Sequence, residues 1–319
     1  MTDVRLHIVT GKGGTGKTTV AAALALALAS GGERVLLCEV EGRQGIASLF
    51  DVAPLPYEER RVAVGPGGGE VVALAIDVEA ALLEYLDMFY RLGRAGKALD
   101  RFGAIDFATT IAPGVRDVLL TGKVYEATRR HDHGQPAYDA VVLDAPPTGR
   151  IGHFLNVNEE VAGIAKVGPI RRQADSIMRL LRSDLSQVHF VTSLEEMPVQ
   201  ETLDGITEIR GVPGMQVGGI VINMARPAVL SQQELKTQPD LTAMAAALGV
   251  AGLYDPDSLA AALAEEISEH ARLIELADRE QTELESTGQP IYELPLMAEG
   301  IDLATLHKLA AELRDQGAA

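Results

Sequence analysis

The residues best suited to chemistry form a glycine-rich loop close to the start of the chain. This loop fits the pattern G-x-x-x-x-G-K-[ST], and it lies between an apolar segment, 6–10, and an alanine-rich one, 20–26. In a strand, loop and helix of this kind, backbone N–H groups surround a phosphate and the helix adds its positive end. A glycine turn without a ligand is the alternative. We predict nucleotide binding by Gly11, Gly13, Gly14, Thr15, Gly16, Lys17, Thr18 and Thr19.

Two side chains of this loop and one distant acid would complete a phosphate and metal site. Lys17 would reach the β and γ phosphates of a nucleotide, and the Thr18 hydroxyl would bind Mg²⁺. Asp144 lies in an apolar, strand-like segment, 140–145, and a carboxylate at such a strand end can hold Mg²⁺ through water. A helix cap or a turn is the other interpretation of Asp144. These residues predict a nucleotide with Mg²⁺ as the cofactors, and the family resemblance described below implies that the nucleotide is ATP or ADP.

Composition limits the classes of protein to which the chain can belong. Its 319 residues can bury a sizeable core, and an apolar content of 47% excludes a disordered chain. The formal charge of −17 argues against nucleic acid and anionic membrane surfaces as partners. With Cys38 as the only cysteine, no disulfide framework is possible and a reducing compartment, the cytoplasm, is expected. No signal peptide or transmembrane run is expected either.

The remaining pattern alternates between strand-like and helical segments. Such alternation predicts an α/β fold with a doubly wound, mostly parallel sheet of seven or eight strands flanked by helices. We expect one P-loop NTPase domain over residues 1–319, with a helical insertion at 78–130 and a surface excursion at 52–70. Strands are expected at 6–10, 34–40, 71–76, 140–145, 188–192, 217–223 and 291–296. Helices are expected near 158–182, 200–210, 231–248, 256–286 and 301–316.

The second lysine of the loop, Lys12, makes the pattern more specific. The string from Lys12 to Thr18 resembles the deviant Walker A motif of the group that contains the ArsA, tail-anchored-protein-targeting, MinD, ParA and nitrogenase iron proteins. In that group the extra lysine reaches the partner's phosphates, so the resemblance implies a nucleotide-dependent dimer. A solvated loop lysine is the alternative. Because we find no second phosphate loop, the partner would be another chain, identical or related.

Two further segments resemble the switches of ArsA-type and tail-anchored-targeting ATPases. Residues 144–155 are similar to switch II, although Arg150 stands where the family commonly has histidine. The segment from Glu39 to Gln44 matches switch I, with glutamates in place of the usual aspartates. The resemblance implies that Glu41 orients the attacking water. It makes Lys12, Lys17, Glu41 and Asp144 the candidate catalytic residues, and the longer acids predict slow hydrolysis.

Three further likenesses concern the base and the dimer interface. Residues 191–202 are similar to a family segment whose first glutamate, here Glu195, lies at the interface. The strand ending at Asn223 resembles one whose terminal asparagine reads adenine, and a side-chain amide can match an adenine edge. A turn residue is the alternative for Asn223. The segment 293–296, which includes Pro295, resembles the loop that closes over the base.

Weaker patterns favour ordinary structure. The run His131-Asp132-His133 could be a metal pair, but a solvated turn is the better interpretation. Apolar residues of the helical insertion could line a groove for an apolar client helix, with core packing as the default. These residues are Met88, Phe89, Phe102, Ile105 and Phe107. The amphipathic helix expected at 256–286 is similarly ambiguous.

Two functions remain open. The first is an ATP-driven dimeric switch that loads or releases an unidentified protein client or membrane-protein partner. The second is a nucleotide-binding subunit that hydrolyses poorly within a heteromeric complex with a related ATPase chain. A single cysteine argues against an arsenite pump subunit, a shared iron–sulfur cluster and a zinc-bridged dimer. The acidic charge argues against ParA-like DNA partitioning, and the segment 303–319 lacks the basic amphipathic character of a MinD-like tail.

Overall fold

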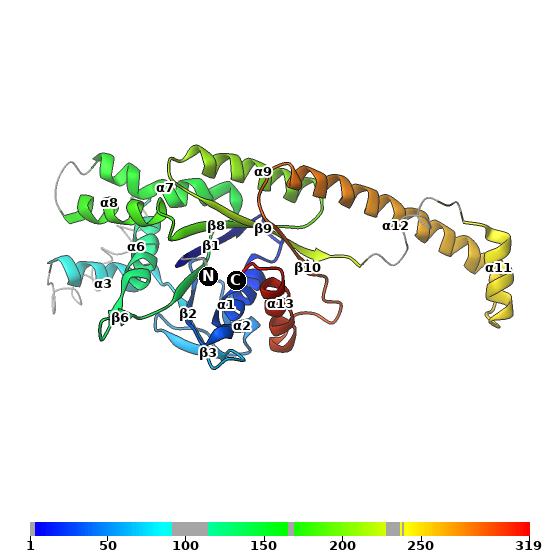
Figure 1. Ribbon diagram of the computed structural model, residues 1–319, viewed down its shortest axis with the longest axis horizontal. Helices are drawn as coiled ribbons and strands as arrows, with labels where there is room; N and C mark the ends of the chain where they lie inside the picture. Colours follow the sequence, from blue (N-terminus) through cyan, green and yellow to red (C-terminus); the bar gives the residue numbers. More distant parts are fainter. Residues whose placement is uncertain (1–3, 91–113, 165–168, 228–236, 238) are drawn as a thin grey trace.

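A single eight-stranded sheet forms the centre of the computed structural model, which describes residues 4–90, 114–164, 169–227, 237 and 239–319 (Figure 1). Along the sheet the strands run in the order β10-β9-β8-β1-β7-β2-β4-β3. Every neighbouring pair is parallel except β3 with β4. The strands are β1 (Leu6–Gly11), β2 (Arg34–Glu39), β3 (Arg60–Val64), β4 (Glu70–Ala75), β7 (Ala140–Asp144), β8 (Ser186–Thr192), β9 (Val217–Ala225) and β10 (Ile291–Pro295).

Helices cover both faces of this sheet and enclose two apolar cores. The helices are α1 (Lys17–Leu28), α2 (Gly45–Leu49), α3 (Val78–Tyr90), α6 (Val115–Arg129), α7 (Thr148–Ile164), α8 (Pro169–Leu181), α9 (Glu196–Gly211), α11 (Leu241–Val250), α12 (Pro256–Glu285) and α13 (Leu303–Asp315). Alternate residues of a strand point to opposite faces. Accordingly, Ile8 packs with α6 to α9 on one side, and Val9 packs with α1 and α13 on the other. The predicted doubly wound α/β fold is confirmed.

The expected surface excursion at 52–70 is wrong in part, because it contains the edge strand β3. This strand pairs antiparallel with β4, and the glycine run between them makes the hairpin turn. Gly65 N–H donates to Gly69 O at 2.7 Å, and Gly68 N–H donates to Gly65 O at 3.0 Å. None of the five residues of β3 is buried. An edge strand buries little, so it lacks the apolar pattern by which strands are recognised.

Several predicted helix boundaries also differ from the structure. The segment 158–182, expected to be one helix, contains parts of two helices, α7 and α8. Helix α7 begins earlier than expected, at Thr148, directly after two prolines. The helix expected at 200–210 begins at Glu196. Of the helix expected at 231–248, the described part is α11, and residues 228–236 and 238 lie outside the described residues.

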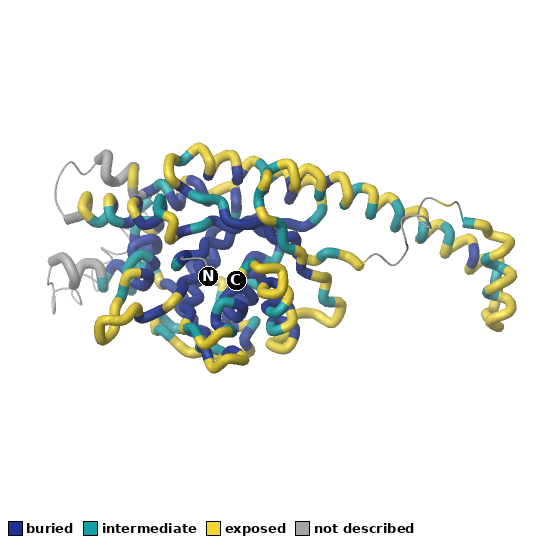
Figure 2. Tube along the Cα trace, viewed as in Figure 1, coloured by how far each residue is buried: buried dark blue, intermediate teal, exposed yellow. Residues whose placement is uncertain are grey.

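The long helix α12 extends far beyond the sheet, and α11 packs beside its distal end (Figure 1). Along this arm the exposed residues form a nearly continuous surface (Figure 2). Among them, Val250 and Tyr254 are 92% and 94% exposed. Nearer the sheet, Leu284 is fully buried, so α12 joins the core only through its last turns. The predicted helix at 256–286 is therefore confirmed, with most of its length outside the core.

The predicted helical insertion corresponds to α3 and α6, which lie between β4 and β7 in the chain. Residues 91–113 lie outside the described residues, so the insertion as a subdomain stays a prediction. Among the described residues, no helix combines the length and the apolar character needed to cross a lipid bilayer. The single cysteine, Cys38, is buried in β2, where burial raises the pKa of its thiol to about 12.

Two histidines form a buried pair on the central strands β1 and β8. The rings of His7 and His189 stack with centroids 5.3 Å apart, and His7 Nδ1 lies 3.1 Å from His189 Nε2. Gly219 N–H donates to His189 Nδ1 at 3.2 Å, so the proton of a neutral His189 is on Nε2 and points at His7. Burial lowers the pKa of His7 to about 4, and burial together with His7 lowers the pKa of His189 to about 3.

This pair predicts that the protein loses stability in mild acid. Both folded-state pKa values lie below the usual value of 6.5, so the unfolded chain binds protons first as the pH falls. The stability that the two neutral histidines contribute is complete above about pH 6.5 and is lost between pH 6.5 and 4. For each histidine, the free energy of unfolding falls by up to about 1.4 kcal/mol per pH unit. Asp144 opposes this loss below its raised pKa of about 6. Thermal melting from pH 7.5 to 5 checks the prediction.

The histidine origin of this acid sensitivity can be separated from a general effect. A His7→Gln, His189→Gln double variant should melt at a temperature that changes less between pH 7.5 and 5 than that of the natural chain. His133→Gln is the matched control, because the His133 side chain is 96% exposed. Equal pH dependence in the double variant and the natural chain would contradict the prediction.

Candidate nucleotide-binding site

The glycine-rich loop lies at the carboxyl end of β1, in the middle of the sheet. Since β7 and β8 flank β1 as parallel neighbours, their carboxyl ends meet the loop at the same edge. Asp144 ends β7, and β2 beyond it places Glu39 opposite Asp144. On the other side, β9 brings Asn223 to this edge. Ligands of open α/β sheets bind at such carboxyl ends, so the topology gathers the predicted residues.

The glycines of the loop serve two different purposes. A side chain at Gly11 would place its Cβ 2.1 Å from Val191 O, and one at Gly16 would place it 2.3 Å from Asn223 Nδ2. Only glycine fits these two positions. By contrast, nothing lies within 4 Å of a Cβ built at Gly13 or Gly14. The open space beside these two residues allows a phosphate to approach the backbone closely.

The start of α1 leaves its backbone donors available. The helix begins at Lys17, and its N-cap, Gly16, has a φ of 84° and no capping side chain. The loop is held from within, because the Thr15 hydroxyl donates to Lys12 O at 2.9 Å. An uncapped helix start has unpaired N–H groups and a partial positive charge, which suit an anion.

Lys17, Thr18 and Asp144 meet beside the loop. The Thr18 hydroxyl donates to Asp144 Oδ2 at 2.7 Å. Burial raises the pKa of Asp144 to about 6, against the opposing effects of the Thr18 hydrogen bond and the Lys17 charge. Burial likewise lowers the pKa of Lys17, and the charges of Asp144 and Glu41 oppose that shift. The hydroxyl and carboxylate oxygens are hard donors of the kind Mg²⁺ prefers, so these two residues fit the metal.

The two glutamates of the predicted switch I segment have different surroundings. Glu39 is buried and accepts the N–H groups of Gly45 and Ile46, both at 3.3 Å, at the start of α2. Glu41 is partly exposed and lies 3.5 Å from Arg43. It still contributes to the pKa shifts of Lys17 and Asp144. Glu39 thus anchors the segment, and Glu41 is the acid left facing the site.

Lys12 is bound within its own chain by a residue that sequence reasoning missed. Lys12 Nζ lies 2.9 Å from Glu201 Oε1, and the Thr148 hydroxyl donates to Glu201 Oε2 at 3.3 Å. Glu201 on α9 therefore joins the phosphate loop to the first residue of α7, in the predicted switch II segment. The signal available in the sequence was an acid on the helix that follows the strand beside β1.

The two switch segments share a neighbour in α6. Arg116, in the first turn of α6, donates to Val40 O at 3.3 Å. The next residue, Asp117, is 3.9 Å from Arg150, the position at which the family commonly has histidine. The arginine thus faces an acid of α6.

Asn223 lies against the phosphate loop. Its side chain is buried, and Nδ2 donates to Thr15 O at 2.9 Å. This contact, together with the close approach of Gly16, places Asn223 behind the loop backbone. Adenine recognition by Asn223 stays a prediction, and the observed contact shows a residue that supports the loop.

The other predicted residues are dispersed around this site. Pro295 ends β10 opposite Ala225, two residues past Asn223, and it is exposed. Thr19 is partly buried in the first turn of α1. Glu195 precedes α9 and accepts a long hydrogen bond, 3.4 Å, from Ser193. Their roles toward a base or a partner stay predictions.

The weaker patterns contribute nothing to this site. The histidine run lies in a small hairpin, β5 (His131–Asp132) and β6 (Gln135–Pro136). Across the described residues, no group of three or more His, Cys, Asp or Glu side chains is placed to hold a metal ion. The side chains proposed for a client groove, Met88, Phe89, Phe102, Ile105 and Phe107, lie outside the described residues.

Comparison with known proteins agrees with this geometry. The sequence model of the family described as anion-transporting ATPase matches residues 4–209. A Mycobacterium tuberculosis protein named ATPase BagA is 51% identical over 322 residues, which cover 99% of this chain and 94% of that protein. An Aquifex aeolicus protein, provisionally named arsenical pump-driving ATPase 2, is 23% identical over 268 residues, or 75% of this chain and 86% of that protein.

Proposed function

The chain belongs to the family of anion-transporting ATPases, and we propose that it hydrolyses ATP slowly with Mg²⁺. We also propose that it forms a dimer whose association depends on which nucleotide is bound. The observation that carries this proposal is the open space beside Gly13 and Gly14, next to an uncapped helix start. Thr18, in the first turn of that helix, donates to Asp144, and Lys17 is close enough for its charge to shift the pKa of Asp144. Family membership supports ATP binding and an ATPase in general, and the rate, the dimer and the client are our proposals.

Each residue of the site has a task set by its chemistry. The backbone N–H groups of the loop and the Lys17 ammonium would bind the β and γ phosphates. Thr18 and Asp144 would hold Mg²⁺, which neutralises charge on the phosphate oxygens when it is bound. Glu41 would orient the attacking water and accept its proton. Asn223 supports the loop backbone. We propose that Asn223 and Pro295 also contact the adenine base of the nucleotide.

Slow hydrolysis follows from the switch I segment. The family's acid at this position is an aspartate, and Glu41 is longer by one methylene group. It is also drawn toward Arg43, 3.5 Å away. A displacement of about 1 Å in a catalytic group can lower a rate by roughly a hundredfold. We therefore propose turnover well below that of an enzyme with the usual aspartate.

The dimer is proposed from Lys12. Its ammonium pairs with Glu201 of the same chain, 2.9 Å away. A lysine that is 28% exposed and paired at the surface can exchange its partner at small cost. In the dimer it would bind phosphates held by the neighbouring chain.

A heteromeric assembly is the second candidate, and the altered switch I segment favours it. In that case the chain would bind ATP or ADP and leave most hydrolysis to a related ATPase chain. In either form we propose a protein client or a membrane-protein partner, one P-loop domain over the whole chain and a cytoplasmic location.

Substitution of Glu41 tests whether the chain itself hydrolyses ATP. Phosphate release from MgATP by the purified protein should fall by about tenfold to a hundredfold in Glu41→Gln, because glutamine cannot accept a proton from water. Glu58→Gln is the matched control, since the Glu58 side chain is 72% exposed and outside the site. If the natural chain, Glu41→Gln and Glu58→Gln all release phosphate equally slowly and still bind ADP, the chain binds nucleotide without hydrolysing ATP itself.

A further inference from the structure

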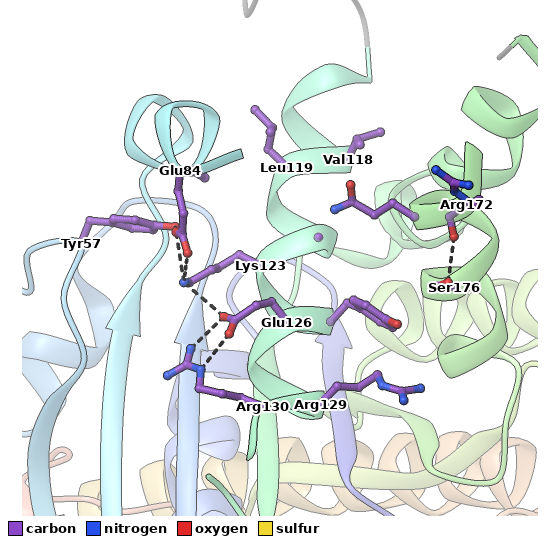
Figure 3. A pocket seen from close by; sticks show the side chains of 14 residues that line it. Tyr57, Glu84, Val118, Leu119, Lys123, Glu126, Arg129, Arg130, Arg172 and Ser176 are labelled. Atoms are coloured by element: carbon purple, nitrogen blue, oxygen red, sulfur yellow. Dashed lines mark hydrogen bonds and ion pairs between the residues drawn. The ribbon is translucent and has the colours of Figure 1, made fainter. Parts of the chain in front are cut away.

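A second cavity lies over α6, and none of its lining residues belongs to the nucleotide loop. Helix α3 forms one wall and α8 forms the other (Figure 3). Its volume is about 520 Å³, within the range of about 300–1,000 Å³ that is usual for small-molecule sites. The apolar part of the lining comes from Ala81, Val118, Leu119 and the ring of Tyr125. These surroundings suit a ligand with an apolar body.

The charged lining is positive, although the chain as a whole is strongly acidic. Four cationic side chains and two carboxylates border the cavity, in a chain of formal charge −17. The cations are Lys123, Arg129, Arg130 and Arg172, and the acids are Glu84 and Glu126. A local excess of cations attracts an anion and repels a cation.

One wall of the cavity is already neutralised within the protein. Lys123 Nζ lies 2.8 Å from Glu84 Oε1 and 3.3 Å from Glu126 Oε2. Arg130 forms ion pairs with Glu126 at 2.8 Å and with Glu59 at 2.7 Å. Because Lys123 and Arg130 already form ion pairs within the protein, they hold α6 against α3 and the edge of the sheet and are not the cations that we assign to a ligand. Figure 3 shows the part of this network formed by Glu84, Lys123, Glu126 and Arg130, on one side of α6.

The other side holds the two cations that remain available. Arg129 and Arg172 are exposed, and within the described part of the chain neither forms an ion pair with a carboxylate. Arg129 comes from the end of α6, where its guanidinium lies 5.8 Å from the centre of the Tyr125 ring. Arg172 comes from the first turn of α8. Two guanidinium groups from different helices therefore border one cavity.

A buried polar atom in the same lining points independently to a ligand. Gln173 Oε1 is buried and has no hydrogen-bond partner among the described residues. A buried polar atom without a partner costs free energy, and a ligand donor could supply the missing bond. Gly122 lies close to this side chain, since a Cβ there would be 3.3 Å from Gln173 Nε2.

We propose that this cavity binds a small organic anion that has an apolar body. Its carboxylate, sulfonate or phosphate group pairs with Arg129 and Arg172, its body packs against α6, and a polar group meets Gln173. Guanidinium groups suit such anions because their N–H donors match two oxygen atoms at once. The ligand site is distinct from the nucleotide site and does not depend on ATP hydrolysis.

Two probes of almost the same shape test this proposal. Titration of the full chain, with saturating ADP and Mg²⁺, uses 8-anilinonaphthalene-1-sulfonate and its uncharged analogue N-phenyl-1-naphthylamine, with fluorescence as the readout. We expect one saturable sulfonate site and much weaker binding of the neutral analogue. Arg129→Gln and Arg172→Gln should each weaken sulfonate binding by roughly tenfold, because each removes one charge-assisted contact.

Matched variants identify the site. Arg171→Gln changes the neighbouring residue of α8, which lies 3.7 Å from Asp175 and outside the cavity lining, and it should leave probe binding unchanged. Gly122→Phe should fill the cavity, with thermal melting and ADP binding showing that each variant folds. Sulfonate affinity that is unaffected by both arginine substitutions would overturn the proposal. Equal affinity for the neutral analogue would also overturn it and would favour an uncharged apolar ligand.

Discussion

Lys17→Ala is expected to weaken ATP and ADP binding by about a hundredfold and to reduce ATP hydrolysis below detection. Lys17 is buried near the Asp144 carboxylate, and burial has already removed part of the hydration of its ammonium. Its pKa is lowered by that burial, so it enters the site poorly solvated and gains strongly from an anionic partner. Equilibrium binding of a fluorescent ADP analogue measures the loss.

The fold should survive this substitution. Among the described residues, the Lys17 ammonium makes one long hydrogen bond, 3.5 Å, to Lys12 O, so alanine breaks no strong bond. Lys308→Ala on α13 is the matched control, because that lysine is exposed and distant in sequence from the site. A Lys17→Ala protein that melts normally and binds nucleotide as tightly as the control would show that the loop has another purpose.

The fold and the centre of the site could be read from the sequence because their signals are local. A buried parallel strand is a short apolar run, and the phosphate loop is a continuous string with a strand before it and a helix after it. Topology then brings Asp144 to Thr18 without further information, since adjacent parallel strands end at the same edge. The edge strand β3 was missed for the opposite reason, because its residues are largely exposed and carry no apolar period.

Long-range side-chain contacts were beyond sequence reasoning. The adenine role of Asn223 is a prediction from the family resemblance, and the sequence does not indicate that its amide donates to Thr15 O, 208 residues away. The only sequence signal for Glu201 was an acid on the helix that follows β8, which does not indicate its contacts with Lys12 and Thr148. Arg150, at the position where the family commonly has histidine, likewise lies 3.9 Å from Asp117, a contact that the sequence does not indicate. Each contact depends on how helices pack across the sheet, which a local pattern does not encode.

Lys12→Ala is expected to retain nucleotide binding and to lose ATP-dependent association. The Lys12 ammonium pairs with Glu201, so its removal leaves the backbone N–H groups of the loop and Lys17 available for nucleotide. A positive charge that reaches buried phosphates of a partner would be lost, at a cost of about tenfold to a hundredfold in the dimer constant. Sedimentation velocity with no nucleotide, with ADP and with a slowly hydrolysed ATP analogue measures association.

The Glu201 contact makes the same mechanism testable in the opposite direction. Glu201→Gln removes the charge that holds Lys12, so the lysine is released and ATP-dependent association should strengthen. The pair is partly exposed, at 28% and 35% for the two side chains, and such pairs contribute at most about 1 kcal/mol, or roughly fivefold. We therefore expect the two variants to change ATP-dependent association in opposite directions, with a large loss for Lys12→Ala and a small gain for Glu201→Gln. If Lys12→Ala associates as the natural chain does, the lysine does not act across a dimer interface.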